Sequence, residues 1–160
     1  MPGTGKSTVG VILAKYLGYD FIDTDILIAA REGRSLPQIL DAEGIDGFLR
    51  IEGDTGASID RTNTVIATGG SMVLSEKAME NLKRNGIVVW LKTPIDELER
   101  RFALSSRRDR GVAAPDNMTT EEIYSSRRPF YEKYADAVIE CEPGTEACVG
   151  QVIAAVEDLI

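Results

Sequence analysis

The order of apolar and polar residues divides the chain into alternating helices and short strands. Directly after residue 8, apolar side chains recur three and four positions apart, which predicts an amphipathic helix that stops at Gly18. Similar spacing through Val149, Val152, Ile153 and Val156 predicts a closing helix. Short apolar runs between polar residues predict strands at 19–23, 64–68, 87–91 and 137–141.

Capping and turn residues mark the other helices. Ser75 and Pro94 each open a helix, and Thr119 with Glu122 three residues later forms a capping box. Further helices are therefore expected at 26–31, 36–42, 45–59, 76–84, 95–102 and 120–134. Because strands and helices alternate throughout, the sequence predicts an α/β fold with three layers, α/β/α, around a mostly parallel sheet.

One long segment, residues 103–118, shows little periodicity and contains arginine, aspartate, glycine and proline. A long irregular segment inside a compact domain is usually a functional lid or a disordered stretch, and we interpret this one as a lid. The chain shows no internal repeat and no linker. Residues 1–160 are therefore predicted to form a single domain with one hydrophobic core.

Charge and composition exclude several classes of function. The net charge of −8 and the lack of a basic stripe argue against a nucleic acid or anionic membrane partner. No apolar run approaches the roughly 20 residues that span a bilayer, and the amino terminus has no signal-peptide pattern. The absence of histidine excludes histidine-based triads and histidine-ligated metals. We expect a soluble, cytoplasmic monomer in which Cys141 and Cys148 are thiols.

The strongest chemical signal is a glycine-rich run that leads into the first helix, Gly3-Thr4-Gly5-Lys6-Ser7-Thr8. In a P-loop, backbone N–H groups wrap around phosphates, and glycine permits the close approach and positive φ that this requires. Lys6 is expected to reach the β- and γ-phosphates of ATP, and the Ser7 hydroxyl to bind Mg²⁺. A glycine-rich turn that only caps a helix is the weaker alternative.

The motif is incomplete on its amino-terminal side. The full pattern G-x-x-x-x-G-K-[ST] has a glycine five residues before Gly5, and the strand that precedes the loop in this architecture is also missing. We therefore interpret Met1 as an internal methionine of a longer chain. The expected sheet has five parallel strands, of which the first is missing here, and its loss is expected to be destabilising.

Two carboxylates end the first predicted strand, in the run Asp23-Thr24-Asp25. Groups at the carboxyl ends of strands face the crevice where α/β sheets bind ligands. One carboxylate would complete the Mg²⁺ shell, and the other could accept a proton from an attacking hydroxyl. Taken alone, Asp25 or Thr24 capping the next helix explains the run equally well. Beside a P-loop, we favour the functional interpretation.

A second strand ends in Thr68-Gly69-Gly70-Ser71, where glycines let the backbone approach a γ-phosphate or a substrate oxygen, although a plain turn gives the same pattern. Guanidinium groups from a lid can stabilise the charge on a transferred phosphoryl group. We expect one or two of five arginines to do so. The candidates are Arg107, Arg108, Arg110, Arg127 and Arg128.

Together these residues resemble the shikimate kinase family, within the nucleoside-monophosphate-kinase-like P-loop kinases, over essentially the whole chain. The resemblance is carried by G-T-G-K-S-T at 3–8, F-I-D-T-D at 21–25, A-T-G-G at 67–70 and R-R-P-F-Y at 127–131. It implies an ATP- and Mg²⁺-dependent kinase of aromatic amino acid biosynthesis, which converts shikimate to shikimate 3-phosphate. On the nucleotide side it implies that Asp23 lies near Mg²⁺, and we expect Arg107 to contact the nucleotide. Residues 142–145 would lie near adenine.

The same resemblance implies roles on the acceptor side. Asp25 would hold the acceptor hydroxyls and act as base or orienter, and Gly69 and Gly70 would line the acceptor and the γ-phosphate. Arg110 would be the lid arginine. Arg127 would grip the carboxylate of the acceptor.

Three positions depart from the family pattern. Leu49 replaces an arginine that pairs with the shikimate carboxylate in the family, and Arg50 lies about 100° further round the helix. Ser71 replaces a third glycine, and the lid reads Arg-Gly-Val-Ala at 110–113 in place of Arg-Pro-Leu-Leu. Loss of one charge-assisted partner is expected to cost about 1.5–3 kcal/mol, or roughly 10- to 100-fold in affinity.

These departures leave alternatives open. The chain could phosphorylate a different small hydroxylated acceptor, or it could bind nucleotide without catalysis. Retention of Lys6, Ser7, Asp23 and Asp25 argues against the second alternative. A further possibility is that the shortened chain neither folds nor binds ATP.

Overall fold

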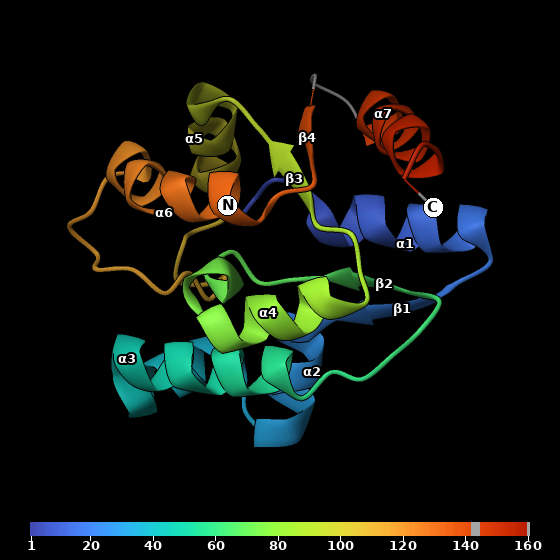
Figure 1. The fold of residues 1–160 in the computed structure, drawn as a ribbon. Helices are drawn as coiled ribbons and strands as arrows, with labels where there is room; N and C mark the ends of the chain where they lie inside the picture. Colours follow the sequence, from blue (N-terminus) through green and yellow to red (C-terminus); the bar gives the residue numbers. More distant parts are fainter. Residues whose placement is uncertain (142–144, 160) are drawn as a thin grey trace.

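The fold is an alternation of helices and strands, described here by a computed structural model for residues 1–141 and 145–159 (Figure 1). The helices are α1 (Lys6–Leu17), α2 (Thr24–Glu32), α3 (Leu36–Ala57), the short 3₁₀ helix η1 (Met72–Leu74), α4 (Glu76–Arg84), α5 (Ile95–Leu104), α6 (Thr120–Tyr134) and α7 (Thr145–Glu157). The strands are β1 (Asp20–Asp23), β2 (Thr64–Ala67), β3 (Val89–Lys92) and β4 (Ala137–Glu140). The predicted elements are thereby confirmed, with ends shifted by a few residues.

The four strands pair in parallel, as predicted, but they form two separate sheets. β1 pairs with β2 in the register Asp20↔Thr64, and β3 pairs with β4 in the register Val89↔Ala137. Within the described residues no ladder joins β2 to β3, and a hollow of about 630 Å³ is lined by both strands and by α1. The sequence predicts four parallel strands of a five-stranded sheet, and the structure arranges these four as two parallel pairs.

The β3–β4 sheet is covered by helices on both faces, which gives the layers of the predicted fold. α1 and α7 lie side by side on one face (Figure 1), where Leu91 packs against Val9 and Val152. On the other face Trp90, one position earlier on the strand, packs into a cluster with residues of α4, α5 and α6. Neighbouring side chains of a strand point to opposite faces, so one strand serves two cores.

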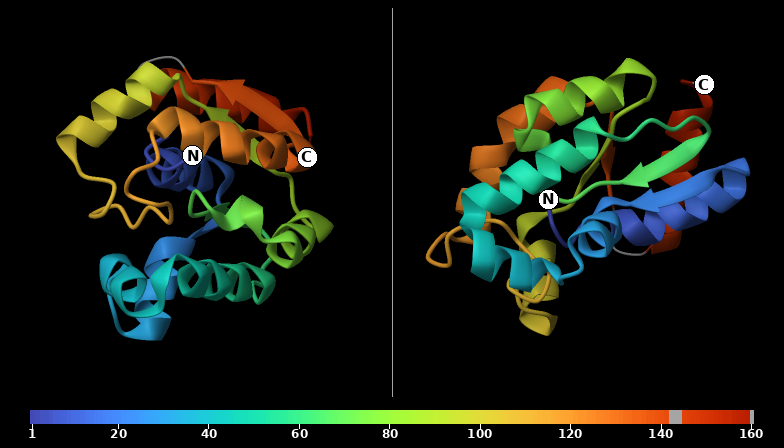
Figure 2. Two further views of the ribbon diagram at one scale, coloured as in Figure 1. Left: turned by 90° about the vertical axis from the view of Figure 1, so that its left-hand side faces the viewer. Right: turned by 90° about the horizontal axis from the view of Figure 1, so that it is seen from below.

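A third cluster lies below the β1–β2 sheet and includes a residue of the irregular segment predicted to be a lid (Figure 1). Its buried members come from α2, α3 and the irregular segment between α5 and α6 (Figure 2), namely Ile28, Ile39, Phe48 and Ala113. The irregular segment runs from Ser105 to Thr119, so α5 takes up the first two residues of the predicted lid. Burial of Ala113 in this cluster packs the irregular segment against α2 and α3.

One local prediction is confirmed and one is changed. The two helices expected at 36–42 and 45–59 lie within α3 on either side of a break at Gly44, where φ is 69° and ψ is −180°. Cys141 and Cys148, expected to be thiols, are joined as a disulfide, because the end of β4 and the first turn of α7 bring the two residues together. Among the described helices, none is long and apolar enough to cross a membrane.

Candidate active site

The glycine-rich run forms the amino-terminal end of α1, as its sequence predicts. Gly5 is the cap residue with φ of 89°, a left-handed conformation that glycine adopts without strain. Lys6 is partly buried, and burial lowers its pKa to about 8, against the opposing effect of Asp25, Glu52 and Asp23. Its ammonium donates to the Met1 carbonyl at 2.6 Å. A lysine at a helix amino terminus is placed to meet an anionic ligand.

The end of β1 lies directly beside this helix. The Ser7 hydroxyl donates to Oδ2 of Asp23 at 2.5 Å, while Oδ1 of Asp23 accepts from the backbone N–H of Asp25 and Ile26 at 2.9 and 3.3 Å. The cap of α2 is therefore Asp23, which corrects the alternative in which Asp25 or Thr24 caps the helix. Because Asp23 performs the capping, the side chain of Asp25 is left free for the pocket.

A pocket of about 330 Å³ joins the phosphate loop, the ends of β1 and β2, α3, α6 and the lid. The charged side chains that line it are Lys6, Asp25, Glu52, Arg110 and Arg127. Burial raises the pKa of Asp25 to about 6, helped by Asp23 and opposed by Lys6. At neutral pH this carboxyl group is mostly ionised but is a better proton acceptor than an ordinary aspartate.

The loop after β2 reaches the pocket through its glycines. The Gly69 N–H donates to the Thr24 hydroxyl at 2.9 Å, which ties this loop to the start of α2. A Cβ at Gly69 would lie 2.8 Å from Oδ1 of Asp25 and would overlap Oε1 of Glu52. Glycine is needed here because the two carboxylates occupy the space of a side chain.

Arg127 supplies the positive charge opposite these carboxylates. It is only 3% exposed, and its Nη2 donates to the lid carbonyl of Ala113 at 2.9 Å. Nη1 has no hydrogen-bond partner within the described part of the chain. A buried guanidinium N–H without a partner is costly, so this position favours an anionic ligand atom.

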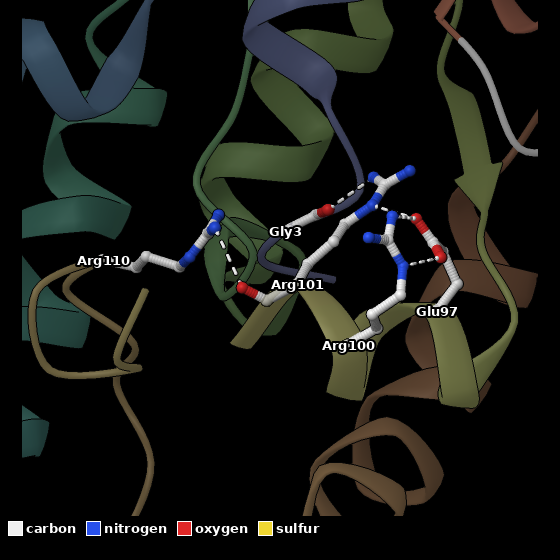
Figure 3. Close-up of polar contacts among 5 residues, drawn as sticks. All are labelled: Gly3, Glu97, Arg100, Arg101 and Arg110. Atoms are coloured by element: carbon white, nitrogen blue, oxygen red, sulfur yellow. Dashed lines mark hydrogen bonds and ion pairs between the residues drawn. The ribbon is translucent and has the colours of Figure 1, made fainter. Parts of the chain in front are cut away.

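Arg110 extends from the lid toward α5 rather than into open solvent (Figure 3). Its Nη2 and Nε donate to the carbonyls of Arg101 and Ser105 at 3.3 and 3.4 Å, and its guanidinium lies 5.8 Å from the centre of the Phe102 ring. Arg101 in turn donates to the Gly3 carbonyl at 2.7 Å (Figure 3). The lid arginine and the phosphate loop are thus connected through α5.

The other predicted arginines lie outside the pocket. Arg107 donates to the lid carbonyls of Met118 and Asp116, Arg108 pairs with Asp41 at 2.8 Å, and Arg128 pairs with Glu132 at 2.6 Å. Within the glycine-rich run, Thr4 is buried, whereas Thr8 lines the pocket. Of the residues expected near adenine, 142–144 lie outside the described residues.

The comparisons with known proteins agree with this arrangement. A family model described as "Shikimate kinase" matches residues 2–157. The chain belongs to the shikimate kinase family. The shikimate kinase of Psychrobacter sp. (strain PRwf-1) is 35% identical over 143 residues, which cover 89% of this chain and 79% of that protein. Shikimate kinase 2 of Dickeya chrysanthemi is 34% identical over 154 residues, covering 94% and 89%.

Solved structures of shikimate kinases also share the fold. The shikimate kinase from Acinetobacter baumannii in complex with shikimate is 30% identical, with a TM-score of 0.87 over 99% of this chain and 89% of that one. The enzyme from Aquifex aeolicus is 28% identical, with a TM-score of 0.73 over 98% and 92%. The P-loop kinase fold predicted from the motifs is therefore confirmed.

The side chains of Leu49 and Arg50 both lie outside the pocket. Leu49 packs on the cluster of Ile28 and Phe48 and does not line the pocket, and Arg50 is exposed. Neither residue places a guanidinium in the pocket. Of the described arginines that line the pocket, Arg110 is partly exposed and Arg127 is buried.

Sequence reasoning missed four residues that hold the site together. Thr24 was considered only as a helix cap, and Glu52 was not selected. Tyr131, whose hydroxyl donates to the Gly70 carbonyl at 2.8 Å, appeared only within a motif. Arg101 could have been noticed from its i,i+4 spacing to Glu97, but that spacing predicts an ion pair and not its contact with the phosphate loop.

Proposed function

We propose that this chain transfers the γ-phosphoryl group of ATP to shikimate, giving shikimate 3-phosphate and ADP. The observation that carries the proposal is that one pocket contains the phosphate-loop Lys6, the partly buried carboxylate of Asp25 and the unpaired Nη1 of Arg127. Lys6 suits the phosphates of the donor, and Asp25 suits the hydroxyl nucleophile. Arg127 suits the carboxylate of the acceptor. Catalysis of this kind depends mainly on positioning and charge stabilisation.

On the nucleotide side, we assign the β- and γ-phosphates to Lys6 and to the backbone N–H groups of the glycine-rich run, residues 3–8. Mg²⁺ would be held by Ser7 and Asp23, whose oxygens already lie within 2.5 Å of each other. Hard oxygen donors in this small number fit Mg²⁺, which takes its remaining ligands from water and phosphate. When bound, the ion supplies neutralisation of the charge on the transferred group.

On the acceptor side, Asp25 receives the proton of the attacking hydroxyl. The hydroxyl oxygen then bonds to phosphorus while the bond from phosphorus to the bridging oxygen of ADP breaks. Arg127 binds the acceptor carboxylate through Nη1, and Gly69 and Gly70 let the backbone approach the substrate. Arg110 stabilises the charge on the equatorial oxygens once the lid closes and excludes water.

The test is an ADP-release assay with ATP, Mg²⁺ and millimolar shikimate. We expect shikimate to stimulate ADP release in the full chain, and Asp25→Asn to lower kcat without loss of ATP binding. The matched control is Asp41→Asn, a change on the surface of α3 at an exposed ion pair with Arg108. If shikimate does not stimulate turnover in the wild-type chain, the proposal is wrong.

A second candidate is a kinase of the same family with another small hydroxylated acceptor. It is favoured by the position of Leu49 outside the pocket, because the pocket then offers one buried guanidinium to an acceptor carboxylate. Leu49→Arg should lower the KM for shikimate if that loss weakens recognition, and an unchanged KM would mean that altered recognition at this position is the wrong explanation. Faster turnover of another polyol or hydroxy acid than of shikimate by the wild-type chain would favour the second candidate.

ATP binding without phosphoryl transfer to any acceptor would instead indicate a nucleotide-binding homologue without catalysis. The monomeric state and the cytoplasmic location stay predictions, to be measured by light scattering and by fractionation.

A further inference from the structure

The loop after β2, here called the acceptor loop (Gly69–Ser71), is held by three different helices. Its first N–H donates to Thr24 at the start of α2, and its middle carbonyl accepts from the hydroxyl of Tyr131 on α6. Its last residue, Ser71, donates through its hydroxyl to Oε2 of Glu52 on α3. Each contact fixes one residue of the loop, so the loop has little freedom to shift along the pocket wall.

The contact with Glu52 differs from the other two because it involves a buried charge. Glu52 is 1% exposed and Ser71 is 5% exposed, and both line the pocket. A buried carboxylate is stable only if it is hydrogen-bonded or paired. The Ser71 hydroxyl supplies such a bond, and the family pattern has glycine at this position, which carries no hydroxyl.

The groups that face Glu52 come from several elements. Burial raises its pKa to about 7, the Ser71 hydrogen bond lowers it, Asp25 of α2 raises it, and Arg127 of α6 and Lys6 of α1 lower it. Tyr131 of α6 also faces this carboxylate. Removing the Ser71 hydroxyl should therefore leave Glu52 easier to protonate, with consequences for the loop and for Arg127.

We infer that Ser71 is a positioning residue of the acceptor site, which holds the acceptor loop against α3 through Glu52 and so sets the affinity for the acceptor. The inference rests on the proposed function for the identity of that acceptor. Ser71 acts through Glu52 and the loop backbone, while the reacting groups are those of Asp25 and the phosphate loop. Its effect therefore belongs to acceptor binding and not to the chemical step.

The first experiment compares Ser71→Ala with Ser75→Ala in the full chain. Ser71→Ala should raise the KM for shikimate roughly tenfold, because a hydrogen bond to a charged group is lost, and leave kcat and the KM for ATP within about twofold. Ser75 is a matched control, since it is a nearby serine that caps α4 by accepting from the Ala78 N–H at 3.4 Å. Its loss should lower stability and leave the KM for shikimate unchanged.

The second readout is the pH profile of kcat/KM for shikimate. Ser71→Ala should move the acid limb to higher pH, and Glu52→Gln should remove the contribution of Glu52 to that limb. In a double-mutant cycle the two changes should not be additive, because both break the same contact. If Ser71 has a purely structural role, Ser71→Ala should leave the acid limb of the pH profile unchanged. The effects of the two changes should then be additive.

The third readout does not depend on turnover. Carbon-13 NMR of the glutamate carboxyl groups, assigned with Glu52→Gln, should show a higher pKa for Glu52 in Ser71→Ala than in the wild-type chain. Shikimate affinity can be followed by fluorescence of Trp90, the single tryptophan, which stacks on Tyr131 at 5.5 Å. If Ser71→Ala does not fold, Ser71→Gly removes the same hydroxyl and matches the family residue.

The outcomes separate the two proposals. A shifted Glu52 titration without any shikimate turnover in the wild-type chain supports the Ser71–Glu52 contact and contradicts the proposed acceptor. An unshifted titration overturns the inference even if the chain is an active shikimate kinase. So does a Ser71→Ala variant whose acceptor KM and acid limb match those of Ser75→Ala.

Discussion

At the scale of single residues, the pocket holds its charges at a cost to stability. Lys6 and Glu52 are both placed where burial disfavours their charged forms, and Asp25 has a raised pKa beside them. Perturbed titrations that cluster in one pocket are typical of functional sites. Two predictions follow from the physical cause of these shifts.

The first concerns Lys6. Lys6→Met should lower kcat by roughly 10²- to 10³-fold, because a cation at the transferred phosphoryl group is lost. The same change should leave thermal stability equal or higher, since the ammonium no longer has to be desolvated. The checks are steady-state kinetics and a melting curve. Lys15→Met, an exposed change at the far end of α1, should alter neither, and a large kcat effect there would contradict the assignment.

The second prediction concerns the pH dependence of stability. The pKa of Glu52 rises from 4.5 to about 7 on folding, so the folded state binds the extra proton. The resulting stabilisation is complete below the unfolded pKa near 4.5 and is lost as pH rises through about 7. It amounts to about 3 kcal/mol at most.

Urea unfolding at several pH values measures this effect. The unfolding free energy of Glu52→Gln should vary less between these pH limits than that of the wild-type chain. An exposed change, Glu132→Gln, should keep the wild-type dependence. Equal pH slopes for Glu52→Gln and the wild-type chain would show that burial of this carboxyl group has been misjudged.

At the scale of elements, local signals predicted the helices and the parallel strands, but not which strands are neighbours. The capping box of Thr119 and Glu122 depends on residues three apart, and it starts α6 where expected. The separation of β2 from β3 depends on the distance between elements that lie far apart in the sequence, and no local pattern records that distance.

The same difference between local and long-range signals explains which residues of the site were predicted. Lys6, Ser7, Asp23 and Asp25 were found because motif spacing and strand ends bring such groups together, and the structure does bring them together. Glu52 was not selected because its importance comes from α3 packing against the acceptor loop. The disulfide was missed for a similar reason, since pairing requires the end of β4 and the start of α7 to face each other.

The third prediction belongs to α3. Gly44 has φ of 69° and ψ of −180°, a region that essentially only glycine occupies, so Gly44→Ala should destabilise the chain by about 1–3 kcal/mol. Gly150 is the matched control, because it lies inside α7 with open space around its Cα. Gly150→Ala should stabilise by about 0.4–1 kcal/mol. Urea unfolding distinguishes the two, and a neutral Gly44→Ala would mean that α3 is not broken there.

At the scale of the whole molecule, non-covalent packing of α1 joins the two half-sheets, and a disulfide adds a covalent tie within one of them. α1 packs against both β1 and β2 and, with α7, against the β3–β4 sheet. The disulfide joins β4 to α7 within this second unit. Stability of the assembly should therefore respond to changes on α7 as well as on α1.

The fourth prediction tests this tie. Reduction of the disulfide between Cys141 and Cys148, which lie seven residues apart, should lower the unfolding free energy by roughly 2 kcal/mol, because the unfolded chain regains freedom. The double variant Cys141→Ser/Cys148→Ser should be insensitive to reductant. Denaturant midpoints with and without reductant provide the measurement. Equal midpoints for the wild-type chain would contradict a stabilising bond.

The two terminal nitrogens of the Arg127 guanidinium have a consequence for how the two substrates affect each other's binding. One nitrogen holds the lid at Ala113, and the other faces the pocket without a partner. An acceptor carboxylate bound to the unpaired nitrogen would restrict the motion of the same guanidinium whose other nitrogen holds the lid. Each substrate should therefore increase the affinity for the other. Such linkage is reciprocal, and calorimetry should find equal enhancement factors whichever substrate is titrated first.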